Sequence, residues 1–235
     1  MILRHNLVID GKNFADFDVW VSGHGTLNMP TPDVETVSVP GRNGDLTMDN
    51  GRYQNIPVAY QCFIRHGFLP NLTAAKDYLL SNRGYRRIED GYHPDHYRIG
   101  RYIGGAEVVG SQMLQQGYFT LEFDCKPERW LKSGEVAQPV GTGAVLRNPT
   151  GMPARPLIKA TGNGTITIGN YSITIANNTG ADIYIDCDLM DAYSGSNNRN
   201  DRITTSAFPV LGAGDNAITI TGLTNVEITP RWWDF

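Results

Sequence analysis

The residues that could carry chemistry are few and widely spaced along this chain. His93 and His96 lie three positions apart, but Pro94 between them prevents the helix that would place both side chains on one face, and no third ligand lies nearby in the sequence. The acids Asp186 and Asp188 would suit a glycosidase only if two carboxylates met in space, and alternating acids on a strand are usually solvated. We therefore expect no metal site and assign no catalytic residue.

Other kinds of site are equally weakly indicated. No serine lies in a Gly-x-Ser-x-Gly elbow, and no phosphate-binding loop or dinucleotide fingerprint is present, so no cofactor is expected. Trp232-Trp233 and Tyr193 are of the type that stacks on sugar rings. A tryptophan pair of this kind also packs on a sheet or a partner. A carbohydrate-binding module therefore stays open as an alternative.

Composition favours a mainly β protein with many turns. The chain has 235 residues, of which 40% are hydrophobic, enough for one large or two small packed domains. Its 26 glycines and 13 prolines exceed the usual share, which favours strands joined by many turns. The net charge is −4 and there is no basic tract to neutralise phosphates, so we expect no tight binding of DNA.

The sequence favours a reduced, membrane-free setting. Cys62, Cys125 and Cys187 form no CxxC pair and are expected to be buried thiols. Residues 1–14 have too short an apolar core for a signal peptide, and no run approaches the roughly 20 apolar residues that span a bilayer. We expect assembly in a cytoplasm and no membrane partner.

Turn-forming residues concentrate between Val39 and Asn55. Pro40-Gly41 fits the central positions of a type II turn, because proline fixes φ and glycine accepts a positive φ. Asn43-Gly44 and Asn50-Gly51 are strong hairpin signals. The stretch is therefore expected to form a compact β-meander with two arginines on its turns, Arg42 and Arg52.

Apolar alternation predicts strands on either side of one helix. The predicted strands cover residues 7–9, 17–21, 34–39, 56–65, 97–103 and 118–125. Residues 71–83 have a helical apolar stripe, with Asn71 as the expected N-cap and Gly84 at an expected left-handed C-cap.

The pattern changes in the region of Lys132, where we place a domain boundary. The expected domains are residues 1–132 and 133–235. The first should be β-sandwich-like, with one α-helix and the meander or hairpin. In the second, short strands alternate with turns, which is typical of a β-sandwich.

Several groups of residues resemble the distal tail protein of siphophages. The N-terminal groups are Val39–Leu46, Gly51–Tyr53 and Asn55-Ile56, followed by the pattern Asp90, Tyr92, Pro94, Asp95, Tyr97 and Arg98. The later groups are Cys125-Lys126-Pro127 with Trp130, Leu131 and Gly134, then Phe208-Pro209, Leu211, Gly214, Asn216 and Ile218, and Pro230–Trp233. The resemblance covers nearly the whole chain, and its last groups are similar to the family's galectin-like second domain.

The resemblance implies a structural protein, not an enzyme. It implies a six-fold ring, a baseplate hub at the tip of a long, non-contractile tail, which joins the tail tube protein to the tail-associated fibre or lysin. Some relatives hold receptor-binding proteins with an arm inserted in the second domain. This chain has no obvious insertion there, which puts direct attachment of receptor-binding proteins in doubt.

Two faces of the first domain are the candidates for contacts between ring subunits, because a cyclic ring uses head-to-tail contacts. The candidate residues are Arg42, Asn43, Asp45, Arg52, Tyr53, Asp90, Tyr92, Asp95, Tyr97 and Arg98. Arginine and tyrosine are favoured at such interfaces. For Arg42 a solvated position on a turn is the competing interpretation. A carbohydrate-binding module and a β-rich hydrolase remain the alternatives to the hub.

Overall fold

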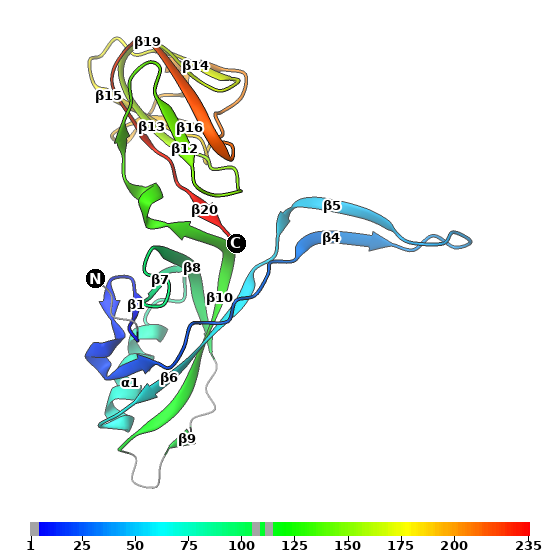
Figure 1. Cartoon of the computed structure of the whole chain (residues 1–235), viewed down its shortest axis with the longest axis vertical. Helices are drawn as coiled ribbons and strands as arrows, with labels where there is room; N and C mark the ends of the chain where they lie inside the picture. Colours follow the sequence, from blue (N-terminus) through cyan, green and yellow to red (C-terminus); the bar gives the residue numbers. More distant parts are fainter. Residues whose placement is uncertain (1–4, 105–108, 111–114) are drawn as a thin grey trace. The chain divides into compact units, whose positions relative to one another are not determined.

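The computed structural model describes residues 5–104, 109–110 and 115–235, and the chain divides into two compact units. Unit 1 comprises residues 1–129 together with Phe235, and unit 2 comprises residues 130–234. Both are built mainly from β-strands, with one α-helix among the described residues (Figure 1). The mainly β fold class predicted from the sequence is confirmed.

A single sheet forms the framework of unit 1, in the strand order β2-β1-β7-β8-β10-β6-β3, and β9 also pairs with β10. Its strands are β1 (Leu7–Ile9), β2 (Lys12–Asn13), β3 (Val19–Val21), β6 (Ile56–Ile64), β7 (Arg86–Asp90), β8 (His96–Gly104), β9 (Val109–Gly110) and β10 (Gly117–Leu131). β6 and β10 run antiparallel from the pair Ile56 and Cys125 to the pair Ile64 and Gly117. Every second residue is buried throughout β6 and in β10 from Gly117 to Pro127, as the alternation in the sequence requires.

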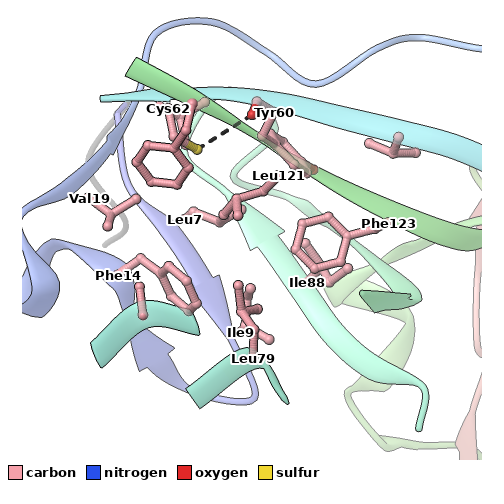
Figure 2. Close-up of a cluster of buried hydrophobic side chains, with 14 of the residues drawn as sticks. Leu7, Ile9, Phe14, Val19, Tyr60, Cys62, Leu79, Ile88, Leu121 and Phe123 are labelled. Carbon is pink, nitrogen blue, oxygen red and sulfur yellow. Dashed lines mark hydrogen bonds between the residues drawn. The ribbon is translucent and has the colours of Figure 1, made fainter. Parts of the chain in front are cut away.

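The buried face of this sheet packs against a 3-10 helix and an α-helix. Figure 2 shows the core, in which Phe14 and Leu79 from these helices meet Leu7, Tyr60 and Leu121 from the sheet. The 3-10 helix, η1 (Phe14–Phe17), occupies the first residue of the strand predicted for 17–21. That strand begins only at Val19, because Asp18 adopts a left-handed conformation with φ of 52°.

The α-helix, α1 (Phe68–Leu80), starts and ends three residues before the predicted bounds. Gly67 takes the N-cap position, so the prediction of Asn71 as N-cap is wrong. The side-chain amide of Asn71 instead donates to the His66 carbonyl oxygen at 2.9 Å. Pro70 fits inside the first turn because no backbone donor is needed there. The helix stops at Ser81 in right-handed geometry, and Gly84 does not adopt the expected positive φ.

The predicted meander is instead one long hairpin, formed by β4 (Pro32–Val37) and β5 (Leu46–Tyr53). It is a two-stranded sheet of its own (Figure 1). Asn50-Gly51 does not turn the chain but lies within β5, where the pairing shifts between Pro32 and Val34. Gly51 has a φ of 68°, and its amide donates to the Asp49 carboxylate at 2.8 Å. The extra residues of β5 therefore form a β-bulge. A bulge, like a turn, accommodates a glycine with a positive φ.

Unit 2 has its own sheet and core. Its strand order is β11-β19-β13-β15-β16-β17, with β12 on β19, and β14 between β13 and β18. The elements are η2 (Lys132–Glu135), β11 (Gln138–Pro139), β12 (Val145–Asn148), β13 (Leu157–Ile168), β14 (Tyr171–Ala176), β15 (Asp182–Asp186), β16 (Asp191–Ser194), β17 (Asn197–Asn198), η3 (Asn200–Arg202), β18 (Ile203–Thr205), β19 (Gly214–Thr229) and β20 (Trp233–Asp234).

The two longest strands of unit 2 change partners along their length. The first part of β13 pairs with β15, and its last part pairs with β14, while β19 follows it throughout. The register shifts between Gly162 and Thr165, where a Cβ on Gly164 would lie only 2.0 Å from the Thr221 carbonyl oxygen. Glycine at this position therefore lets the two strands cross closely and bend together.

Candidate functional site

The hairpin of β4 and β5, which we call the arm, is the most exposed element among the described residues of unit 1. All described residues of β5 are exposed, as are those of β4 apart from Asp33. Its base is closed by a hydrogen bond from the Gln54 amide to the Thr31 carbonyl oxygen at 2.9 Å. The Asp33 carboxylate accepts bonds from Gln54 at 3.2 Å and from Arg52 at 2.6 Å, and these bonds lower the pKa of Asp33.

The tip of the arm, residues 38–45, holds the first three predicted interface residues. The Arg42 amide donates to the Val39 carbonyl oxygen at 3.1 Å across Pro40-Gly41, and Gly41 has a φ of 80°, as a type II turn requires. Arg42, Asn43 and Asp45 are all exposed. In the part of the chain that the structure describes, no ion pair engages Arg42 or Asp45.

Apolar side chains accompany these charges along the arm. The exposed ones are Val34, Val37, Val39, Leu46, Met48 and Tyr53. A two-stranded ribbon by itself is marginal in water, and its unpaired edges favour association with another chain. An exposed ribbon that also carries this many apolar residues is a surface suited to burial against a partner.

The second predicted group, residues 90–98, is largely folded into unit 1. Asp90 is only 8% exposed, and its carboxylate accepts hydrogen bonds from the Tyr92 amide at 2.9 Å, the His93 amide at 2.8 Å and the Tyr60 hydroxyl at 3.1 Å. Burial, and next the nearby Asp90 charge, raise the pKa of Tyr60 well above its ordinary value. Asp90 therefore shapes the following turn and does not face outward, contrary to its expected place on an outer face.

The remaining residues of this group differ in exposure. Asp95 is exposed, whereas Tyr92 and Tyr97 are half-buried. The Tyr92 hydroxyl lies 3.1 Å from Nδ1 of His5, and the Arg87 guanidinium lies 3.7 Å from the centroid of the Tyr97 ring. Among the predicted interface residues of this segment, Asp95 is thus fully accessible, and Tyr92 and Tyr97 are accessible in part.

Arg98 is the least expected member of the group. It is only 8% exposed, and its Nη1 atom is buried without a hydrogen-bond acceptor among the described residues. Burial lowers the pKa of Arg98. Asp90 is near enough to act on it electrostatically, but the Asp90 oxygens already accept the bonds described above. An outward-facing role for this side chain is therefore wrong for the isolated subunit.

Arg98 lines a cavity of about 440 Å³ in unit 1 that the sequence did not reveal. Its walls come from a segment before the arm, the end of β5, strands β8 and β10, and the C-terminal residue. The residues around Arg98 are Leu27, Asn28, Met29, Pro30, Tyr53, Arg129 and Phe235. These positions are far apart in the sequence. The one local signal is the run Leu27–Pro30, in which Leu27 and Met29, on either side of the polar Asn28, are 58% and 91% exposed.

Asp186, one of the acids considered for a hydrolase, is engaged in an ion pair within unit 2. Asp186 is buried, and both of its oxygens accept bonds of 2.7 Å from the Arg231 guanidinium. The expectation of a solvated Asp186 is therefore wrong. Burial by itself raises the pKa of Asp186, but the bonds from Arg231 and two backbone amides outweigh this effect and hold that pKa below its ordinary value. A glycosidase acid needs the opposite shift.

The aromatic residues considered for sugar binding are mostly engaged within unit 2. Trp232 is 3% exposed and belongs to the core, and the Trp233 indole donates to the Pro153 carbonyl oxygen at 2.9 Å. Tyr193 stacks on Tyr184 with 5.5 Å between ring centroids. The tryptophan pair therefore packs on its own unit.

Over the described residues, no group of three or more histidine, cysteine, aspartate or glutamate side chains could hold a metal ion. Cys62, Cys125 and Cys187 are buried, and burial raises the pKa of each thiol to about 12. No helix in the described part of the chain is long and apolar enough to cross a membrane.

Comparison with known proteins gives structural matches only. No protein-family model matches the chain, and neither does any curated protein sequence. The solved structure of the Dit protein of phage SPP1, described as a paradigm of the hub adsorption apparatus in phages that infect Gram-positive bacteria, is similar, with a TM-score of 0.75 and 12% identity. The match covers 98% of this chain and 99% of that one.

Two structures of the phage p2 baseplate in its activated conformation, one with strontium and one with calcium, are also similar. Their TM-scores are 0.52 and 0.51, with 10% and 9% identity, and each match covers 95% of this chain and 96% of the other. At these identities the likeness concerns the fold. The chain therefore has the fold of a phage distal tail protein, which confirms the resemblance found in the sequence.

Proposed function

We propose that this chain is the distal tail protein of a phage with a long, non-contractile tail, and that it forms a ring-shaped baseplate hub in the virion. The observation that carries this proposal is the likeness to SPP1 Dit over 98% of the chain, which includes both units and the arm. The groups of residues that resemble the family also fall in both units. The likeness in fold and the likeness in these groups therefore support the same proposal, although the overall sequence identity to SPP1 Dit is only 12%.

The arm is our candidate for the element that closes the ring, with six subunits as the expected number. A cyclic ring needs two different surfaces on each subunit, one for each neighbour. The arm offers one such surface, since its apolar and charged side chains are both exposed. Arg42 is our choice for a contact with a carboxylate or a main-chain carbonyl of the neighbour.

Unit 1 and unit 2 would then have different roles. Unit 1 would form the ring between the tail tube protein and the tail-associated fibre or lysin, because it carries the arm and most of the candidate interface residues. Unit 2, a galectin-like β-sandwich in this proposal, would face outward toward the host-adsorption apparatus. Direct attachment of receptor-binding proteins is not part of the proposal, since no long insertion interrupts the strands of unit 2.

The proposal assigns no catalysis and no cofactor to the chain. Asp186, one of the acids considered for a hydrolase, does not have the surroundings of a general acid, because its bonds from Arg231 favour the ionised form. The carbohydrate-binding alternative depended on an exposed tryptophan pair, and the burial of Trp232 removes its main support.

Sedimentation velocity and negative-stain images of the purified chain test the proposal. We expect closed rings of six subunits at micromolar concentration. Val37 and Leu46 are paired residues, so replacing residues 38–45 by Asn-Gly would join β4 to β5 through a two-residue turn. This shortened chain should fold with an unchanged melting temperature and remain monomeric.

Lys76→Ala, at an exposed position of α1 outside the arm, is the matched control and should leave the rings intact. A full-length chain that stays monomeric at every concentration would contradict the proposed function. Rings formed equally well by the shortened chain would show instead that the arm does not close them.

A further inference from the structure

Three asparagine–glycine pairs occur in this chain, and the structure places them in three different settings. They are Asn43-Gly44 at the tip of the arm (Figure 1), Asn50-Gly51 within β5 and Asn163-Gly164 within β13. An asparagine before a glycine is prone to deamidation, because glycine has no side chain to keep its backbone nitrogen away from the asparagine side chain. The sequence makes the three pairs alike in this respect, so only the folded structure can separate them.

Deamidation is spontaneous and needs no reactant except water. The glycine backbone nitrogen gives up its proton and attacks Cγ of the asparagine, and the side-chain nitrogen takes up a proton and leaves as ammonia. Water then opens the resulting succinimide ring at either carbonyl carbon, which gives aspartate or isoaspartate, the latter with the backbone running through Cγ. Nothing is oxidised or reduced. Each product is negatively charged at neutral pH, because a carboxyl group ionises far below it.

At the tip of the arm both reacting groups are accessible. Asn43 and Gly44 are exposed and lie outside the paired strands, whose last pair is Val37 with Leu46. Within the described residues, neither the Asn43 side chain nor the Gly44 amide makes a hydrogen bond. The Asn43 side chain can therefore turn toward the Gly44 nitrogen, and water can reach both groups.

The pair in β5 is held by the bulge. The Gly51 amide donates to the Asp49 carboxylate at 2.8 Å, and the negative charge of this acceptor opposes loss of the amide proton. Paired residues lie on both sides of the bulge, so the backbone at Asn50 has little freedom to turn. Attack on the Asn50 side chain therefore requires the Gly51 bond to break first.

The pair in β13 is held from both sides of its strand. Gly164 pairs with Ile175 of β14, and a Cβ built on Gly164 would lie 2.0 Å from the Thr221 carbonyl oxygen of β19. The Asn163 side-chain amide donates to the side-chain oxygen of Asn178. Closure of a succinimide ring here requires this part of the sheet to open locally.

We propose that Asn43 is a site of spontaneous deamidation in the folded chain, whereas Asn50 and Asn163 are protected. The inference goes beyond the proposed function, because the reaction needs only the folded subunit and water. Residues 38–45 carry one positive and one negative side chain, Arg42 and Asp45. Deamidation therefore gives a neutral tip a net negative charge.

A consequence for the ring follows, and this consequence rests on the proposed function. The new carboxylate lies next to Arg42, our candidate for a contact with a neighbouring subunit. It competes with the neighbour's acceptor for the guanidinium and repels a carboxylate there. Deamidated subunits should therefore associate less tightly than unreacted ones.

Peptide mass spectrometry of the aged chain tests the modification. Trypsin cuts after Arg42 and Arg52, so Asn43 and Asn50 fall in one short peptide, and its fragment ions distinguish them; peptides left uncut at Arg42 are counted as well. After incubation of the folded chain at mildly alkaline pH, Asn43 should react at least about tenfold faster than Asn50 or Asn163, since both of these need a local opening. The same chain in denaturant is the matched control, and its three pairs should react within about threefold of one another.

Ion-exchange chromatography of the intact chain supplies a second readout. Aged parent chain should separate into an unreacted fraction and a more negative one. Asn43→Gln keeps the side-chain amide but would have to close a larger and less favoured ring, so this variant should give no such fraction at the same time. Asn50→Gln is the matched variant at the protected pair and should behave like the parent.

Sedimentation velocity of the two parent fractions tests the consequence for the ring. The deamidated fraction should associate about two- to fivefold less tightly than the unreacted one, which is the effect of one exposed charge pair.

The outcomes separate this inference from the proposed function. Similar rates at the three pairs of the folded chain, or an unreacted Asn43, would overturn the modification site. Two fractions that form rings equally well would overturn only the consequence for the ring. A chain that is monomeric in both fractions overturns the proposed function, while the mass measurement still decides the modification.

Discussion

Replacing Asp186 by asparagine should destabilise unit 2 without affecting any hydrolytic activity. The carboxylate is 5% exposed and accepts two bonds of 2.7 Å from Arg231, and it also accepts the Asp188 and Leu189 amides at 3.0 and 3.2 Å. Breaking a buried pair by removing one partner costs about 3–5 kcal/mol. Because the Arg231 side chain is still 27% exposed, water partly screens the loss. We expect about 3 kcal/mol.

Chemical denaturation of the parent chain and the variant measures this difference in the free energy of unfolding. Asp188→Asn is the matched control, since Asp188 is 58% exposed and lies 3.8 Å from Arg155, so its loss should cost less than about 0.5 kcal/mol. Equal stability of the Asp186 and Asp188 variants would refute the reasoning. Hydrolysis of a cell-wall polysaccharide by the parent, abolished in either variant, would refute the assignment of a structural role.

The pH dependence of the same variant has a definite sign. The folded pKa of Asp186 lies below its ordinary value, so the unfolded chain binds the proton more readily. The stabilisation by the pair is therefore fully present above the unfolded pKa of about 3.9, and it is lost as the pH falls through the folded pKa. The difference between parent and variant should be constant from about pH 5 upward and shrink below about pH 4. A difference that grows on acidification would contradict the sign.

Three further predictions concern the packing, the units and the ring. Gly134→Ala should destabilise unit 2 by at least about 2 kcal/mol, because the added Cβ would lie 2.3 Å from the Trp232 backbone nitrogen. Chemical denaturation measures this difference, and an unchanged midpoint would show that the backbone around Trp232 shifts easily. In light scattering, residues 130–235 alone should be folded and monomeric, whereas residues 1–129 should associate; the reverse result would contradict the proposed division of labour. Titration with duplex DNA at low salt should give no micromolar binding, because the tail hub that we propose must let DNA pass; binding with a steep salt dependence would contradict this expectation.

Local patterns predicted the elements whose stability depends on their own residues. Alternation in residues 56–65 and 118–125 predicted β6 and β10, since every second side chain of a half-buried strand must be apolar. The Pro40-Gly41 turn was also predictable, because proline and glycine fix the local backbone themselves. The start of α1 was not predictable in this way, because the helix begins three residues early, after the N-cap Gly67, where Phe68 is buried in the core.

The placement of charged residues was decided by the tertiary structure alone. By itself the sequence determined a mainly β chain with a turn-rich segment that resembles a phage tail protein, because periodicity and turn chemistry are properties of neighbouring residues. It could not determine whether Asn50-Gly51 turns the chain or bulges a strand, since both accept a positive φ. Nor could it separate the buried Asp90 and Arg98 from the exposed Asp45. Burial depends on which distant segments pack around a side chain, and no local pattern records that.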